Sequence, residues 1–273
     1  MRFSIPTPTT SEVALGPLTI HFYALCIITG VAVAIWLTQR RFSVYGTQTR
    51  GIVSDVAVVA VPAGVIGGRL YHVLTTPEKY FGRNGQPLDA LKIWEGGLGI
   101  WGAIALGALG ASIAYRALAS SRDLPTFPHF LDALAPGVIF AQAIGRWGNW
   151  FNGELFGSPL QAPWALEIPT YLRPSGYAQF ETFHPTFLYE FIWCTIVGIA
   201  LILFGKSARG ASMPAGSLFL AYVAAYCVGR FFIEGVRIDG AHTFAGLRVN
   251  HYVSLILGLG AGAFFTLNLR HSR

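Results

Sequence analysis

Charged residues are scarce in this sequence. Of its 273 residues, 19 are Lys or Arg and 13 are Asp or Glu, so that 12% of the chain is charged, against about 25% in a typical soluble domain. So few charges cannot cover a soluble protein of this length, and the 53% of hydrophobic residues excludes an intrinsically disordered chain. A mean hydropathy of +0.51 agrees with both exclusions. The composition predicts an integral membrane protein.

Cysteine and the common cofactor motifs are also rare. Cys26, Cys194 and Cys227 each lie in an apolar stretch without metal-binding spacing, and we interpret them as small buried hydrophobes. The seven histidines form no HExxH pattern, and the chain has no Walker loop, nucleophile elbow or dinucleotide fingerprint. We therefore expect no metal and no cofactor. The net charge of +6 comes from basic residues scattered between apolar runs, so we expect no nucleic-acid partner either.

Long apolar runs dominate what is present. A helix needs about 20 mainly apolar residues to cross a bilayer, and seven stretches qualify: residues 18–39, 51–74, 94–118, 130–147, 185–204, 214–236 and 249–269. We predict an all-α, polytopic membrane protein with about seven transmembrane helices, forming a single domain over residues 1–273. The fourth stretch is the weakest, because it is short, contains Pro136 and runs into a polar motif.

The Lys and Arg residues between these stretches predict an orientation. One set of loops carries nine basic residues: Arg40, Arg41, Arg50, Arg116, Arg122, Lys206, Arg209, Arg270 and Arg273. In the opposite set, acidic residues offset the three basic ones in the loop after the second stretch. We therefore expect an outer N-terminus and a cytoplasmic C-terminus. The proline-rich loop at 148–184 should then face outward as an ordered cap.

Several charges lie inside the apolar stretches, where charges are costly and usually functional. They are Arg69, Arg146, Glu190, Arg230 and Glu234. In the sixth stretch Tyr226, Arg230, Glu234 and Arg237 follow at spacings of four, four and three, which puts them on one helix face. Two interpretations stay open: an Arg–Glu pair that fixes helix packing, or a cation held for an anionic group such as phosphate.

Two glycine-rich stretches differ in their polar content. Residues 145–157, GRWGNWFNGELFG, carry two amides, an arginine and a glutamate, more than helix capping needs. Their glycines suggest a chain that bends to meet a ligand. Residues 94–110, WEGGLGIWGAIALGALG, have small residues typical of close helix packing. The block HPTFLYE at 184–190 opens the fifth stretch with Pro185 at a first helical position, so His184 should face the same outer site.

These blocks resemble the bacterial phosphatidylglycerol–prolipoprotein diacylglyceryl transferase family. Residues 145–157 match its signature G-R-x-G-N-x-x-N-x-E-x-x-G. The supporting blocks follow in family order: HFYAL with Tyr23, GGR at 67–69, WEGGLGIWG, HPTFLYE, and YCVGRFFIEGVR with Tyr226 and Arg230. The resemblance extends from about Tyr23 to His251. The topology of this family agrees with the seven spans and the outer N-terminus predicted above.

The resemblance implies a reaction and its partners. Members transfer a diacylglyceryl group from phosphatidylglycerol to the lipobox cysteine in the signal peptide of a prolipoprotein. A thioether forms and glycerol phosphate leaves, during lipoprotein maturation. We accordingly expect a multi-pass protein of the bacterial plasma (inner) membrane, among membrane lipids, with its active site toward the outer leaflet.

The resemblance also implies the site residues. By position these are Arg146, Asn149, Gly157, Tyr23, Tyr226 and Arg230. We hypothesise that Arg146 and Arg230 converge on the lipid phosphate, where contacts that strengthen with the charge on the leaving group promote the reaction. Asn149 and Tyr23 would orient the head group. Asn152 and Glu154 would hold the arginines, and Arg69 and Glu234 are further substrate-binding candidates.

One position departs from the family. Many members carry a histidine, proposed as the base, where this sequence has Trp101, and tryptophan cannot accept a proton. Either His184 or Glu154 takes the thiol proton, or the arginines alone lower the pKa of the thiol enough. Both residues are therefore predicted catalytic residues beside Arg146 and Arg230.

Two other functions compete with the transferase. A transporter or channel also places charges inside a bundle, but the sequence shows neither inverted repeats nor paired broken helices. A membrane scaffold with buried ion pairs has no need for the polar cluster at 145–157. The transferase is the prediction, with the transporter or channel as the alternative.

Overall fold

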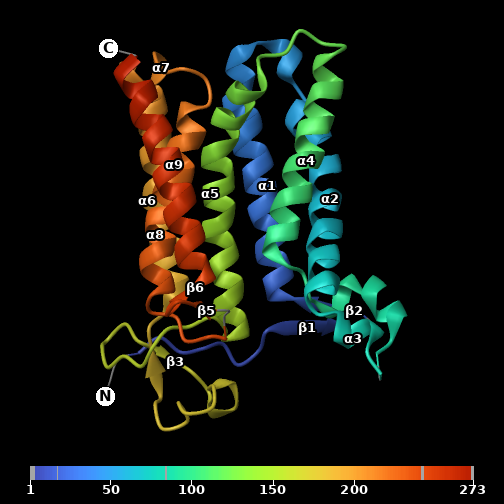
Figure 1. The fold of residues 1–273 in the computed structure, drawn as a ribbon, viewed down its shortest axis with the longest axis vertical. Coiled ribbons are helices and arrows are strands. Elements are labelled where there is room, and N and C mark those ends of the chain that lie inside the picture. The colour runs from blue at the N-terminus through green and yellow to red at the C-terminus, as the bar shows by residue number, and fades with distance from the viewer. Residues whose placement is uncertain (1–3, 17, 84, 241–242, 272–273) are drawn as a thin grey trace. The chain divides into compact units, whose positions relative to one another are not determined.

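The computed structural model describes residues 4–16, 18–83, 85–240 and 243–271. Within them lie seven long helices (Figure 1): α1 (Phe22–Phe42), α2 (Ile52–Thr75), α4 (Ile100–Ala119), α5 (Phe127–Asn152), α6 (Thr186–Lys206), α8 (Ser217–Glu234) and α9 (Val249–His271). Each is long and apolar enough to cross a membrane. The predicted all-α, polytopic fold is confirmed, and each helix overlaps one predicted stretch.

Short elements connect the long helices. The two short helices are α3 (Pro77–Phe81) and α7 (Ala208–Ala211). Three antiparallel pairs join β1 (Glu12–Leu15) to β2 (Leu18–His21), β3 (Leu166–Glu167) to β4 (Thr182–Phe183), and β5 (Thr243–Phe244) to β6 (Leu247–Arg248). Single turns of 3-10 helix occupy residues 43–45, 47–49, 93–95 and 170–172, and a longer one residues 87–91.

The fourth span differs from the expectation. Helix α5 tolerates Pro136 and continues to Asn152, so the loop begins at Gly153 rather than at residue 148. The bend expected within residues 145–157 is present, but residues 145–152 remain helical. The turn comes after the helix, where Gly153 and Leu155 have φ of 59° and 58°. Gly148 serves packing, since a Cβ there would lie 2.4 Å from the Tyr23 ring.

The chain divides into two compact units. The larger unit comprises Met1–Thr38 and Leu131–Arg273, and the smaller unit comprises Gln39–Phe130. The single domain expected over residues 1–273 stays a prediction. Each unit is described below by itself.

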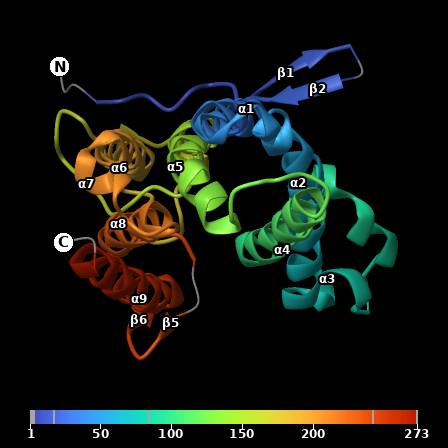
Figure 2. The same cartoon turned by 90° about the horizontal axis from the view of Figure 1, so that it is seen from above.

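Glycines let two helices meet in the smaller unit. Helices α2 and α4 run side by side (Figure 2). A Cβ on Gly67 would lie 2.2 Å from the carbonyl oxygen of Gly102, and a Cβ on Gly102 would lie 2.1 Å from that of Gly67. The two backbones are thus in direct contact, which only glycine permits. The interpretation of residues 94–110 as a close-packing stretch is confirmed.

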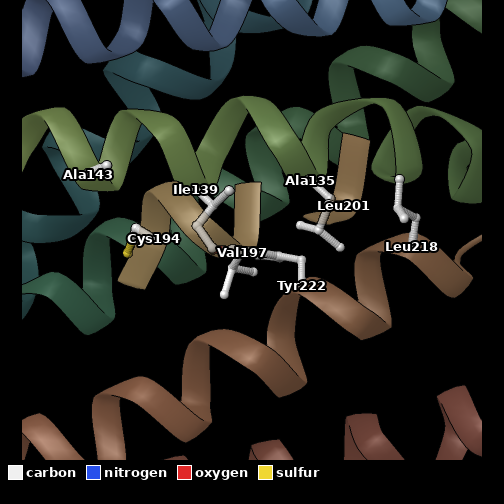
Figure 3. Close-up of a cluster of buried hydrophobic side chains, with 8 residues drawn as sticks. All are labelled: Ala135, Ile139, Ala143, Cys194, Val197, Leu201, Leu218 and Tyr222. Carbon is white, nitrogen blue, oxygen red and sulfur yellow. The ribbon is translucent and has the colours of Figure 1, made fainter. Parts of the chain in front are cut away.

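A buried core holds α5, α6 and α8 together in the larger unit. Its members are Ala135, Ile139, Ala143, Cys194, Val197, Leu201, Leu218 and Tyr222 (Figure 3). Ala143 lies three residues before Arg146, and Cys194 four residues after Glu190. Tyr222 precedes Arg230 on α8. Packing at these positions fixes the rotation of each helix and so the direction of the charged side chain on it.

The three cysteines are free thiols. Cys194 and Cys227 are buried, as predicted, but Cys26 is partly exposed. Cys26 lines an apolar groove of about 280 Å³ between α1 and α5. Its environment therefore differs from the buried one we expected, because α1 turns this residue away from the core.

The loop between α5 and α6 has a core of its own. Phe156, Leu166, Ile168, Phe183 and Phe187 form its buried cluster. The N-terminal segment joins it, since Ile5 N–H donates to the Ala165 carbonyl at 2.8 Å and Glu167 N–H to the Ile5 carbonyl at 2.8 Å. The indole of Trp150 also donates to the Pro6 carbonyl at 3.0 Å. The loop is an ordered structure, and its outward orientation stays a prediction.

Candidate active site

Glu190 joins three helices at one carboxylate. It lies on the first turns of α6, where its side chain is 5% exposed. Its Oε2 is 2.8 Å from Nε of Arg146 on α5, and its Oε1 accepts a hydrogen bond of 2.8 Å from Nη1 of Arg230 on α8. A carboxylate so deeply buried is stable only with such partners. Arg146 and Arg230 therefore meet at Glu190, and their convergence on a lipid phosphate stays a prediction.

Glu234 forms a second junction one turn beyond Arg230 on α8. Its side chain is fully buried. Its Oε2 lies 2.6 Å from Nη2 of Arg230, and its Oε1 lies 2.7 Å from Nε of Arg248. Asn250 donates a hydrogen bond of 3.1 Å to Oε1. The pairing of Arg230 with Glu234 confirms the shared face predicted from their spacing.

Asp239 links Arg237 to Arg248. It accepts bonds of 2.7 and 2.9 Å from Nε and Nη2 of Arg237, and one of 2.9 Å from Nη2 of Arg248. Partial burial alone would raise the pKa of Asp239. The hydrogen bonds and positive charges of Arg237 and Arg248 outweigh it and hold that pKa below its usual value. Asp239 is therefore an anion at neutral pH.

The signature residues form a branch on Arg146. Asn149 accepts from Nη1 of Arg146 at 3.3 Å and donates to Oε1 of Glu154 at 2.9 Å. Asn152 donates to the same oxygen at 3.2 Å. Spacings of three on α5 put Arg146, Asn149 and Asn152 on one face. The turn at Gly153 then brings Glu154 back toward them, so Glu154 reaches Arg146 only through Asn149.

We call this connected set the arginine–carboxylate network. Its direct ion pairs join four arginines (Arg146, Arg230, Arg237 and Arg248) to three carboxylates (Glu190, Glu234 and Asp239). With Glu154, which is linked to Arg146 through Asn149, the connected set contains four arginines and four carboxylates.

Two arginines remain open to a ligand. The side chain of Arg146 is 21% exposed and that of Arg230 is 15% exposed. Within the described residues, Nη2 of Arg146 makes no hydrogen bond. The network therefore presents guanidinium groups to an anion.

Two predicted tyrosines lie near these arginines. The ring of Tyr226 stacks on that of Tyr222 with 6.3 Å between centroids. Its hydroxyl interacts electrostatically with Glu190, Arg146 and Arg230. Tyr23 packs on Gly148 and interacts electrostatically with Glu154 and Arg146. Both phenols can therefore orient a group bound to Arg146.

Gly157 and His184 lie beside the network rather than in it. Gly157 N–H donates to the His184 carbonyl at 3.0 Å, and a Cβ on Gly157 would lie 2.8 Å from both the His184 Cβ and the Val236 carbonyl oxygen. Gly157 is thus required where three chain segments cross. The His184 ring bonds the Tyr189 hydroxyl at 3.1 Å. Burial lowers the pKa of His184 below its usual 6.5, which favours neutral imidazole.

Arg69 belongs to the smaller unit, where carbonyl oxygens surround its guanidinium. It donates to the carbonyls of Ala90 at 2.9 Å, Gly96 at 2.5 Å and Gly97 at 3.2 Å, and also to that of Asp89. These bonds tie α2 to the segment before α4. The substrate-binding role of Arg69 stays a prediction, and its geometry favours a structural one.

Three network members were not predicted from the sequence: Asp239, Arg248 and Asn250. They lie in and after the connection between α8 and α9, to which we assigned no role from the sequence. Glu190 was noticed as a charge in a span and was expected to face an internal site, but it was given no specific role there. The signal that could have found Asp239 is the run of alternating charges Arg230, Glu234, Arg237 and Asp239, which continues past the end of the helix.

Among the residues that the structure describes, no three His, Cys, Asp or Glu side chains lie close enough together to hold a metal ion. The network instead offers guanidinium donors within a bundle of membrane-type helices. Fold and site together define a polytopic membrane protein with an internal arginine–carboxylate site.

Residues 11–267 match the model of a family described as prolipoprotein diacylglyceryl transferase, and the chain belongs to this family. Three relatives illustrate the similarity. Phosphatidylglycerol–prolipoprotein diacylglyceryl transferase 2 of Streptomyces coelicolor is 51% identical over 95% of this chain and 79% of its own length. The phosphatidylglycerol–prolipoprotein diacylglyceryl transferase of Paenarthrobacter aurescens is 48% identical over 97% of this chain and 83% of its own length. That of Bifidobacterium adolescentis is 45% identical over 96% of this chain and 80% of its own length.

Family membership confirms the resemblance found in the sequence. It establishes a membrane transferase of lipoprotein biosynthesis. It gives no support to the transporter or channel alternative.

Proposed function

We propose that this chain transfers the diacylglyceryl group of phosphatidylglycerol to the lipobox cysteine of a prolipoprotein signal peptide. The cysteine sulfur attacks the glyceryl carbon that bears the phosphate. The carbon–sulfur bond forms as the carbon–oxygen bond breaks, and the electron pair leaves with glycerol phosphate. The observation that carries this proposal is the convergence of Arg146 and Arg230 on Glu190 from two helices.

The two arginines suit the leaving group. A phosphodiester gains negative charge on one oxygen as its ester bond breaks, and guanidinium groups bind such oxygens through parallel hydrogen bonds. Nη2 of Arg146 is open for this contact. Glu190 and Glu234 hold Arg230 in place before the lipid arrives, so little reorganisation is needed during the reaction.

The acyl chains need an apolar surface beside the network. The groove of about 280 Å³ between α1 and α5 is lined by Phe22, Leu25, Cys26, Thr29, Ile144, Trp147 and Phe151. Trp147 directly follows Arg146 in the chain. A lipid with its phosphate at Arg146 could place an acyl chain in this groove and extend into the surrounding membrane lipids.

The thiol proton has two candidate acceptors. Glu154 is a carboxylate, but its Oε1 already accepts from Asn149 and Asn152. His184 has a lowered pKa, so its neutral form is available at physiological pH. The field of the arginines can also favour the thiolate without a base.

The proposed location is the bacterial plasma membrane, with the site toward the outer leaflet. The N-terminal segment pairs with the loop between α5 and α6 through Ile5 and Ala165. The N-terminus and this loop therefore share one side of the membrane. The basic loops at the other ends of the spans favour the cytoplasm for the opposite side.

One reaction tests the proposal. Purified protein in detergent is mixed with phosphatidylglycerol and a lipobox peptide, and the peptide is analysed by mass spectrometry. We expect a mass increase equal to one diacylglyceryl group that survives neutral hydroxylamine, which cleaves thioesters but not thioethers. A peptide with Ser in place of the cysteine is the control. If the cysteine peptide stays unmodified, the proposal is wrong.

A further inference from the structure

We propose that Arg248 is a positioning residue: it fixes the carboxylate of Glu234 and thereby places the guanidinium of Arg230 for the lipid phosphate. This inference rests on the proposed function, because only there does Arg230 bind a phosphate. Arg248 ends β6 and precedes α9, so it lies on a different element from the two groups that it would position.

The two oxygens of Glu234 have separate partners. Oε1 is 2.7 Å from Nε of Arg248 and accepts from Asn250 at 3.1 Å, whereas Oε2 is 2.6 Å from Nη2 of Arg230. Glu234 is fully buried, so these protein groups determine the orientation of its carboxylate. Because Arg248 and Asn250 hold Oε1, the carboxylate cannot rotate freely, and Oε2 keeps a fixed direction toward Arg230.

Arg248 is itself held on three sides. Its Nε faces Glu234, its Nη2 bonds Asp239 at 2.9 Å, and its Nη1 donates to the Arg237 carbonyl at 2.8 Å. Only the planar fork of an arginine reaches three such groups at once, and a lysine ammonium in its place would serve fewer. This geometry gives Arg248 a fixed position from which to hold Glu234.

Removal of Arg248 should change the position of the Arg230 guanidinium rather than merely weaken the fold. Glu234 and Asp239 would then each lose one positively charged partner. The carboxylate of Glu234 would also be free to rotate, and both of its oxygens could then pair with Arg230. Arg230 would be displaced from the phosphate, and a shift of about 1 Å at a reacting centre can lower a rate about 100-fold.

The test compares Arg248→Gln, Arg248→Lys and wild type, with kcat and KM measured separately for phosphatidylglycerol and for a lipobox peptide. We expect Arg248→Gln to lower kcat about 10- to 100-fold and to leave KM for the peptide unchanged. Arg248→Lys should recover part of the loss. Arg209→Gln removes the same charge from the exposed helix α7 and should match wild type.

The outcomes separate this inference from a purely structural role. Wild-type kcat in Arg248→Gln, whatever its melting temperature, would overturn it. If Arg248→Gln does not fold, Asn250→Ala decides, because it removes one donor to Oε1 without changing any charge. A lowered kcat in Asn250→Ala supports the inference, and an unchanged kcat overturns it. If wild type itself forms no thioether, the proposed function fails, and this inference fails with it.

Discussion

Nε of Arg146 on α5 lies 2.8 Å from Oε2 of Glu190 on α6, in a site where the Glu190 side chain is 5% exposed. Nothing in the spacing of these two residues along the chain relates them. The same carboxylate also holds Arg230 on α8. This one acid therefore sets the distance between the two cations to which we assign the lipid phosphate.

Loss of the Glu190 charge should cost both stability and activity. In Glu190→Gln, two partly buried guanidinium groups lose their shared anion, and removal of one partner from a buried ion pair costs about 3–5 kcal/mol. We expect a lower melting temperature in detergent and little transfer activity. The control is Glu12→Gln, which removes a carboxylate from an exposed pair with His21 and should leave both measurements unchanged. A Glu190→Gln protein as stable as wild type would contradict the structural role assigned to this residue.

Arg146→Ala should abolish most of the transfer while the protein still inserts into the membrane. Loss of one preorganised donor to a developing negative charge lowers rates about 10²- to 10³-fold. Arg146→Lys keeps the charge but lacks the donors that reach Glu190, Asn149 and the phosphate together. Its rate should therefore lie between the rates of Arg146→Ala and wild type. Thioether formation per folded protein is the measurement. Normal activity in Arg146→Ala would remove Arg146 from the mechanism.

The pH dependence of His184→Gln separates the candidate bases. Burial lowers the pKa of His184 below 6.5, so as a base it would be active above that pKa and would lose activity as the pH falls through it. Wild type should then show an acid limb in log(kcat/KM) below pH 6.5. That limb should disappear in His184→Gln together with much of the rate. An unchanged profile excludes His184 and leaves Glu154 or the arginine field.

Close helix packing in the smaller unit predicts a steric effect. Gly67→Ala would place a methyl group 2.2 Å from the Gly102 carbonyl oxygen, and such overpacking costs about 1–3 kcal/mol. Gly260→Ala on α9 is the matched control, because a Cβ there meets nothing within 4 Å. The control should be neutral or slightly stabilising, since alanine favours helix over glycine. Equal melting temperatures for the two variants would show that α2 and α4 can separate at little cost.

Much of the fold could be predicted from the sequence, because the bilayer restricts spanning segments to apolar helices. Seven runs of sufficient length predicted seven helices. The end of α5 was missed, since Pro136 and the glycines at 145 and 148 weaken a helical pattern on local propensity alone. In the structure α5 continues through Asn152 because Tyr23 packs against Gly148 and Trp147 against Phe187 and Phe191.

The candidate site, like the fold, could be predicted only in part from the sequence. Arg146, Asn149, Asn152, Glu154, Arg230 and Glu234 could be selected from the sequence, because their helical spacings and signature are local features of the chain. The sequence by itself thus determined the membrane class, the family and some members of the ion-pair network. Only the tertiary structure decided that Glu190 bridges Arg146 and Arg230, and that Arg248 holds Glu234. Those contacts depend on how packing rotates α5, α6 and α8 and on where the chain returns before α9, and one-dimensional spacing does not encode either of them.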